Sequence, residues 1–191
     1  MFNIRFFILE IAVVFAGCGG GGTTTTTDTE EVFSEPSQKE LLVAINGVRS
    51  RKIDCKNGLG EVGPSQPLSW NHELYSSAYE HSHDLAMSNT FSHYGSGTEH
   101  DITGYNRGGQ SYFTERIEDN GYSEYDTIGE NIAGGFSTME AVIDGWLESP
   151  SHCENLMRES FNEMGIAIVV NPDSQYGVYW TQNFGHRDLS E

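Results

Sequence analysis

Residues 129–152 place a carboxylate, Glu130, and an imidazole, His152, at opposite ends of one stretch of chain. Ser149 followed by proline is typical of an N-cap and the first position of a helix, which puts His152 in a first helical turn. There the helix dipole disfavours imidazolium, so we expect a neutral ring whose lone pair can bind a metal or accept a proton. A histidine that only caps its helix is the alternative.

Two further histidines have contrasting surroundings. His93 lies in the polar, glycine-rich segment SNTFSHYGSG, residues 88–97, and histidines in loops carry function more often than those in cores. His81 lies on the apolar stripe of a helix predicted over residues 71–87. We therefore expect His81 to be a hydrogen-bonded core residue and His93 to be a candidate site residue.

The segment 95–128 has little regular patterning. Its residues RIEDNGY, 116–122, indicate the end of a helix with Gly121 at the C-cap. His100, between Glu99 and Asp101, could bind a cation, although a solvated acidic loop is the alternative. Four aromatic residues here could line a groove or pack locally: Tyr94, Tyr105, Tyr112 and Phe113.

Two helix starts have the S-x-x-E spacing of a capping box. Ser37 with Glu40 predicts a helix that runs to about residue 51, and Ser137 with Glu140 predicts the helix between the two site residues. The second helix has one apolar stripe: Met139, Val142, Ile143 and Trp146. It should therefore pack against the core.

Strand-forming residues appear after His152. GIAIVV, residues 165–170, and VYWTQNF, residues 178–184, flank the turn segment NPDSQYG, which is the pattern of a β-hairpin. Helices precede strands without regular alternation, so we predict an α+β fold with helices packed on a mostly antiparallel sheet.

Composition indicates one globular domain with an N-terminal appendage. The chain has 191 residues, 37% of them hydrophobic, and a net charge of -18. Residues 1–36 hold one arginine and five acids, so residues 37–191 retain a charge of -14. Such a surface repels nucleic acid and anionic lipid headgroups.

The first eighteen residues, 1–18, resemble a bacterial lipoprotein signal peptide, in which Cys18 becomes the lipidated N-terminus. The apolar run from residue 6 to 15 is too short to span a bilayer. Glu10 inside the run and Phe15, where leucine is usual, depart from the pattern. An ordinary secretory signal is the alternative, and either one places the domain outside the cytoplasm.

Residues 19–36, GGGGTTTTTDTEEVFSEP, have almost nothing to bury, so we predict a disordered tether. A flexible segment of that length reaches roughly 23 Å. The domain, residues 37–191, would therefore stay close to its membrane.

Lipidation of Cys18 leaves Cys55 and Cys153, and disulfides persist outside the cytoplasm. We expect these two cysteines to be bonded, with two buried free thiols as the alternative. The bridge would close a loop of about 100 residues and stabilise the fold by up to about 4.7 kcal/mol in the chain-entropy model.

Several segments together resemble the CAP superfamily, or SCP domain, of cysteine-rich secretory proteins, venom allergens and plant pathogenesis-related proteins. The resemblance covers residues 38–186 and follows the family's order of motifs: LLVAINGVR, PLSWNHEL, FSHYG, GENIA, GWLESPSHCENLM, FNEMGIA and YWTQNFG. It implies an α-β-α sandwich with a cavity lined by two histidines and two acids. Bacterial members often pair cysteines at the positions of Cys55 and Cys153.

Motif by motif, the resemblance assigns the two cavity histidines to His93 and His152 and the first acid to Glu130. The second acid departs from the family pattern. Eukaryotic members carry it where this chain has Ser149, and Glu148 lies one position earlier, about 100° away around a helix. Glu148 is therefore a doubtful cavity residue.

Two neutral imidazoles facing one cavity suit a divalent metal, above all Zn²⁺, with Glu130 as a ligand or a water-bridged partner. The chain has no G-x-S-x-G motif, and Cys153 is expected in a disulfide, so nucleophilic catalysis is disfavoured. We expect a membrane-tethered binding module for a small molecule, a lipid or a protein rather than an enzyme. Metal-assisted or general-base hydrolysis by the same cavity is the alternative.

Overall fold

The computed structural model describes residues 33–188, so the expected signal peptide and Cys18 lie outside the described residues. Phe33 packs edge-on against Trp180, with ring centroids 6.2 Å apart. Phe33, which lies in the segment 19–36 that was expected to have almost nothing to bury, therefore packs against the core.

The described chain contains helices and strands, and strands also occur before His152, where the sequence predicted none. Their bounds are α1 Gln38–Arg49, β1 Ile53–Asp54, β2 Glu61–Val62, β3 Ser69–Trp70, α2 His72–Ser88, α3 Ile102–Arg107, α4 Phe113–Asp119, β4 Thr127–Gly134, α5 Met139–Glu148, α6 Pro150–Met157, β5 Glu163–Asn171 and β6 Gly177–His186.

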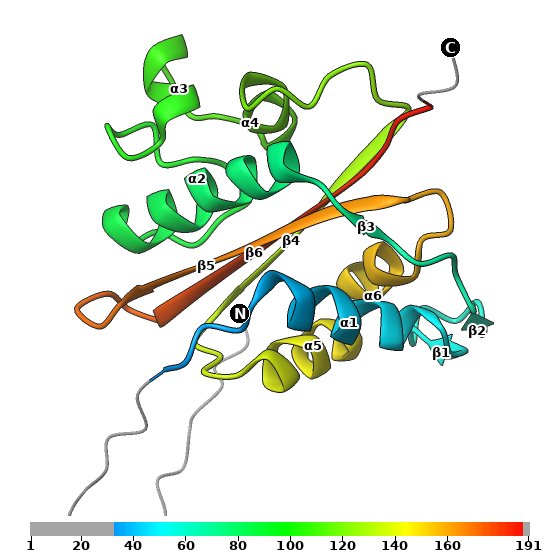
Figure 1. Ribbon diagram of the computed structural model, residues 1–191. Coiled ribbons are helices and arrows are strands. Elements are labelled where there is room, and N and C mark those ends of the chain that lie inside the picture. Colours follow the sequence, from blue (N-terminus) through cyan, green and yellow to red (C-terminus); the bar gives the residue numbers. More distant parts are fainter. Residues whose placement is uncertain (1–32, 189–191) are drawn as a thin grey trace, which may run out of the picture. The chain divides into compact units, whose positions relative to one another are not determined.

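A four-stranded sheet in the order β3-β5-β6-β4 forms the middle layer. The pairs β5-β6 and β4-β6 are antiparallel, and only the two-residue strand β3 runs parallel to its neighbour. Helices α2, α3 and α4 lie on one side of this sheet and α1, α5 and α6 on the other (Figure 1). The predicted α-β-α sandwich with a mostly antiparallel sheet is confirmed.

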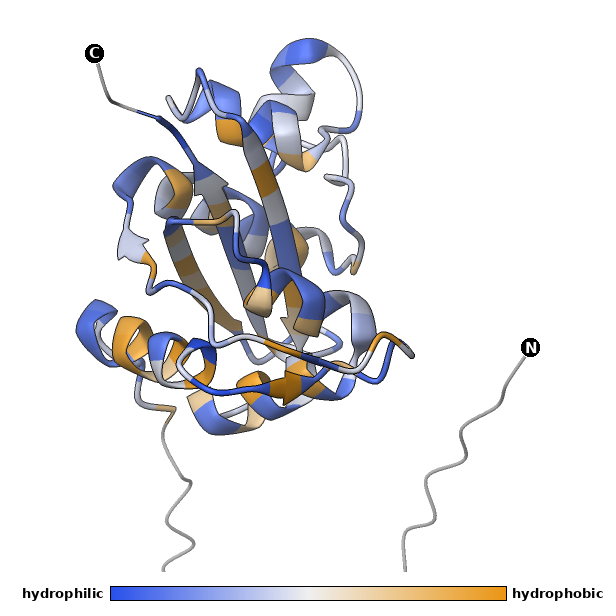
Figure 2. Ribbon diagram, turned by 90° about the vertical axis from the view of Figure 1, so that its right-hand side faces the viewer, coloured by the Kyte–Doolittle hydropathy of each residue, from blue (hydrophilic) through white to orange (hydrophobic). Residues whose placement is uncertain are grey.

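Helices on both sides explain why the central strands are buried on both faces. Most of β5 and β6 is buried, and Figure 2 shows hydrophobic residues along the strands that the helices cover. Helix α2 approaches β5 so closely that a Cβ at Gly165 would collide with the backbone of Tyr75. A glycine at this position therefore sets the distance of the helix that precedes the His93 loop.

Of the two predicted capping boxes, one is confirmed and one is wrong. At the start of α1, Glu40 accepts from Ser37 N and Ser37 Oγ accepts from Glu40 N. Helix α5 is capped instead by Thr138, whose Oγ1 accepts from Ala141 N at 3.1 Å. Ser137 and Thr138 could both act as the N-cap, and the structure uses Thr138. The residue three positions after Thr138 is Ala141, which has no carboxylate to complete a capping box.

Cys55 and Cys153 form a disulfide with their Cα atoms 5.4 Å apart, as expected. The bond joins the loop after β1 to helix α6 across 98 residues of sequence. No helix among residues 33–188 is long and apolar enough to cross a membrane.

Candidate functional site

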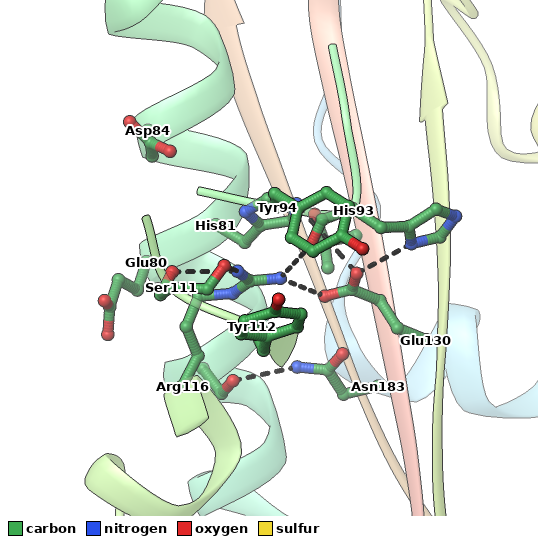
Figure 3. A network of polar contacts seen from close by, with 12 residues as sticks. Glu80, His81, Asp84, His93, Tyr94, Ser111, Tyr112, Arg116, Glu130 and Asn183 are labelled. Atoms are coloured by element: carbon green, nitrogen blue, oxygen red, sulfur yellow. Dashed lines mark hydrogen bonds and ion pairs between the residues drawn. The ribbon is translucent and has the colours of Figure 1, made fainter. Parts of the chain in front are cut away.

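Glu130 is the centre of a polar network between α2, α4 and β4, shown in Figure 3. It lies on β4 with its side chain 1% exposed. Its Oε1 is 2.9 Å from His93 Nδ1, and its Oε2 accepts from Arg116 Nη2 at 2.9 Å. Both carboxylate oxygens are therefore engaged inside the protein.

The surroundings of Glu130 keep it ionised. Burial by itself would raise the pKa of its carboxyl, but the neighbouring His81, Arg116 and His93 together lower that pKa to about 2. The fixed guanidinium of Arg116 is the only one of these groups that stays charged at every working pH. Glu130 is thus a carboxylate at neutral pH.

His93, in the loop after α2, is oriented by this carboxylate. A carboxylate only accepts hydrogen bonds, so Nδ1 of His93 carries the proton and donates, which leaves the lone pair of the neutral ring on Nε2. Arg116 Nη2 also donates to the carbonyl oxygen of His93 at 3.0 Å. A histidine with one nitrogen bonded to a carboxylate is the usual arrangement of a metal ligand.

His152 lies in the first turn of α6, with Ser149 as N-cap and Pro150 as the first helical residue. Its ring centroid is 6.4 Å from that of His93. Burial, and then repulsion from His93, lower the pKa of His152, so the ring is neutral at pH 7. The predicted neutrality agrees with this direction, but burial and His93 are its causes rather than the helix dipole.

His81 is a core residue, as expected. Its side chain is 0% exposed and its Nε2 bonds the carbonyl oxygen of Ser92 at 2.9 Å. Burial lowers the pKa of His81 to about 4, against an opposing effect of Glu130, so this ring is also neutral. It lies only 3.9 Å from Glu130 Oε1, which places it behind the site as a packing partner.

Two imidazole rings are the potential metal donors at this site. No group of three or more histidine, cysteine, aspartate or glutamate side chains within the described residues could hold a metal ion. His93 Nε2 and the neutral ring of His152 remain as donors, whereas both oxygens of Glu130 are engaged. Glu130, expected as a metal ligand or a water-bridged partner, is in this structure the hydrogen-bond partner that orients His93.

Glu148 is not part of this site, which corrects its doubtful assignment. Its side chain is 76% exposed and pairs with Lys56 Nζ at 3.2 Å. Ser149 ends α5 and begins α6, and its side chain makes no capping bond. The one-residue shift from the family position turns the acid outwards, as the 100° rotation per helical residue requires.

Aromatic residues form part of a pocket of about 500 Å³ beside His93. Tyr94 and Tyr112 meet edge to face there, with centroids 4.9 Å apart, and Phe113 also lines the pocket. The fourth expected aromatic, Tyr105, is 62% exposed and does not line this pocket.

Asp101 fits neither of the two accounts given for the segment around His100, a cation site or a solvated acidic loop. Asp101 is buried and accepts from Gly97 N, Gly104 N and Ser111 N, so its carboxylate organises the loop rather than facing solvent. The His100 ring meets His83 edge-on at 5.8 Å.

Arg116 is the site residue that sequence reasoning missed. It is 1% exposed and also donates to Ser111, while its helix α4 was visible only as RIEDNGY with a predicted C-cap. The C-cap is Asn120, one residue before Gly121. A charged residue in a short polar segment carries no signal that it is buried, so only its partner Glu130 could have indicated it.

Comparisons with known proteins agree on the fold. A family model described as the cysteine-rich secretory protein family, CAP, matches residues 42–184. Two Bacillus subtilis proteins, the uncharacterized membrane protein YlbC and the uncharacterized protein YkwD, are 28% and 27% identical over 78% and 74% of this chain. These stretches cover 34% and 48% of the relatives, so the chain spans less than half of either one.

Two solved structures share the architecture. An extracellular protein containing an SCP domain from Bacillus anthracis is 25% identical, with a TM-score of 0.57 over 78% of this chain and 40% of that one. An outer surface protein from Borrelia burgdorferi is 20% identical, with a TM-score of 0.56 over 80% and 97%, which shows the fold alone.

Proposed function

Because the chain belongs to the cysteine-rich secretory protein (CAP) family, we propose that it is an extracytoplasmic binding module whose His93 and His152 hold a divalent metal. The observation that carries this proposal is the pair of histidine rings 6.4 Å apart, one of them oriented by a buried carboxylate. A membrane anchor at Cys18 would keep the module at a cell surface.

Zn²⁺ is the metal that this chemistry favours. It accepts imidazole nitrogen at about 2.0–2.1 Å and tolerates open positions filled by water or by a ligand. Bound there, it would supply a Lewis-acid site beside the aromatic pocket. His93 would bind through Nε2, because Glu130 holds its Nδ1.

Several observations favour binding over general-base hydrolysis. Glu130 has both oxygens engaged and a pKa lowered to about 2, so it is a weak base at neutral pH. The aromatic rings of Tyr94, Tyr112 and Phe113 offer apolar surface to a small or lipid-like ligand. The pocket thus combines an oriented imidazole with an apolar wall.

Zn²⁺ affinity should depend on both histidines. We expect His93→Ala and His152→Ala each to weaken binding more than Glu130→Gln, which should cost about 10- to 100-fold because it only orients His93. Isothermal titration calorimetry of the four proteins measures this order. His100→Ala, which removes a histidine outside the site, is the matched control and should bind like the wild type.

The same titrations should show affinity falling as the pH is lowered, because protons compete with the metal for the imidazole nitrogens. Because the pKa of His152 is lowered, protons compete with the metal for this ring only at a pH below the ordinary pKa of histidine. Identical Zn²⁺ affinity in wild type, His93→Ala and His152→Ala would exclude the metal site.

An extracytoplasmic location is supported by two similar proteins, a membrane protein of Bacillus subtilis and an extracellular protein of Bacillus anthracis. We expect mass spectrometry to find a lipid on Cys18 as the mature N-terminus, and Cys18→Ser to release the protein from membranes. A Cys18→Ser chain that still fractionates with membranes would contradict the anchor.

A further inference from the structure

A second groove lies on the outer side of the helical layer that contains α2. It has a volume of about 870 Å³ and is lined by α2, α3 and the end of α4. None of its lining residues lines the pocket beside His93. The groove is therefore a separate surface, and nothing in the proposed metal site depends on it.

Three aromatic rings line the groove in a row along α2. Tyr75, Tyr79 and His83 follow one another at four-residue spacing, so they lie on one helix face. Their consecutive ring centroids are 6.4 and 6.1 Å apart. Tyr79, in the middle, is 48% exposed, although nothing in the fold requires an aromatic residue on this outer face.

The groove is also negatively charged. Its lining contains two acids, Glu80 and Asp119, and no lysine or arginine, although Arg107 at the end of α3 pairs with Asp119. Glu80 lies in the groove, and its oxygens accept from Thr103 N and Asn120 Nδ2, both at 2.7 Å and both uncharged donors. Its charge is satisfied by hydrogen bonds but is not neutralised by a cation.

We propose that this groove binds an extended peptide with lysine or arginine at alternate positions. Alternate side chains of an extended strand point to the same side and repeat at about 6.7 Å, twice the rise of about 3.3–3.4 Å per residue. That repeat matches the spacing of the rings along α2. Each cation can then lie against one aromatic face while the carboxylate of Glu80 adds long-range attraction.

Charge separates this ligand from a neutral glycan, which also stacks on aromatic rings. A glycan would gain nothing from the carboxylate of Glu80, which has only uncharged hydrogen-bond donors among the described residues. The observations therefore favour the basic peptide, and the glycan becomes an outcome of the test.

Fluorescence anisotropy of a labelled seven-residue Lys-Ser repeat, titrated with the full chain, tests the proposal. We expect saturable binding that weakens with added salt. Tyr79→Leu should weaken binding about 2- to 5-fold and Tyr75→Leu with Tyr79→Leu about 5- to 30-fold, whereas Tyr79→Phe keeps the aromatic face and should bind like the wild type. Tyr105→Leu, an exposed tyrosine outside the groove, is the matched control.

Two further ligands make the test decisive. A peptide with the same number of lysines at every third position loses the match to the rings and should bind more weakly than the alternating one. Preference for a neutral N-acetylglucosamine oligomer, equal affinity for both lysine peptides, or unchanged affinity in Tyr79→Leu would each overturn the proposal. Urea unfolding curves that match the wild type would show that any loss of peptide binding in the variants does not come from loss of folding.

Discussion

Replacing Arg116 with methionine is expected to lower the free energy of unfolding by about 3–5 kcal/mol, the usual cost of removing one partner of a buried ion pair. Its guanidinium and the Glu130 carboxylate are each 1% exposed and 2.9 Å apart. Without the arginine, Glu130 keeps a buried charge whose remaining partners are neutral histidines. The variant also loses hydrogen bonds to Ser111 and to the His93 backbone.

Urea unfolding at pH 7 measures this loss. Arg107→Met is the matched control, because Arg107 pairs with Asp119 at the surface, where solvent screens the charges and the pair adds little stability. Adding Glu130→Gln to Arg116→Met should recover part of the stability by removing the stranded charge. A loss of less than about 1 kcal/mol in Arg116→Met would show that the pair is not the anchor of this network.

The position of Arg116 links stability to the site. One guanidinium holds the carboxylate that orients His93 and also the backbone of His93 itself. Arg116→Met should therefore weaken Zn²⁺ binding as well as folding, whereas a purely structural ion pair would leave the affinity of the folded fraction unchanged. The two measurements together distinguish these roles.

Periodic and local signals predicted the fold well. The apolar stripe of α5, the capping box of Ser37 and the turn between residues 171 and 177 depend on near neighbours, so the sequence contains them directly. The pairing of His93 with His152 came from family motifs, because the loop after α2 and helix α6 meet only through the fold.

The missed features depend on contacts between distant segments. Arg116 and Glu130 are both charged, and charged residues are expected at the surface unless a buried partner is known. Arg49 is similar: it is 0% exposed and donates to the carbonyl oxygens of Leu156 and Phe161. These bonds connect α1 to the end of α6 and to the loop that follows it, and no local sequence pattern in α1 predicts them.

Removing the Cys55–Cys153 disulfide is expected to destabilise the domain by about 2–5 kcal/mol, the range for native disulfides in small secreted domains. The bond spans 98 residues, so its loss frees a long loop in the unfolded chain. Both cysteines are 0% exposed, so the double variant Cys55→Ala with Cys153→Ala also loses packing. Reduced wild type loses the bond but keeps the sulfur atoms.

Urea unfolding of oxidised wild type, reduced wild type and the double alanine variant, all with Cys18→Ser, separates the two contributions. The disulfide holds the first turns of α6, where His152 precedes Cys153, so its loss should also loosen the histidine pair. We expect weaker Zn²⁺ binding in the alanine variant, which cannot supply thiolate ligands as the reduced protein can. Equal stability of oxidised and reduced wild type would mean that hydrogen bonds, such as those of Arg49, and core packing hold α6 in place without the disulfide.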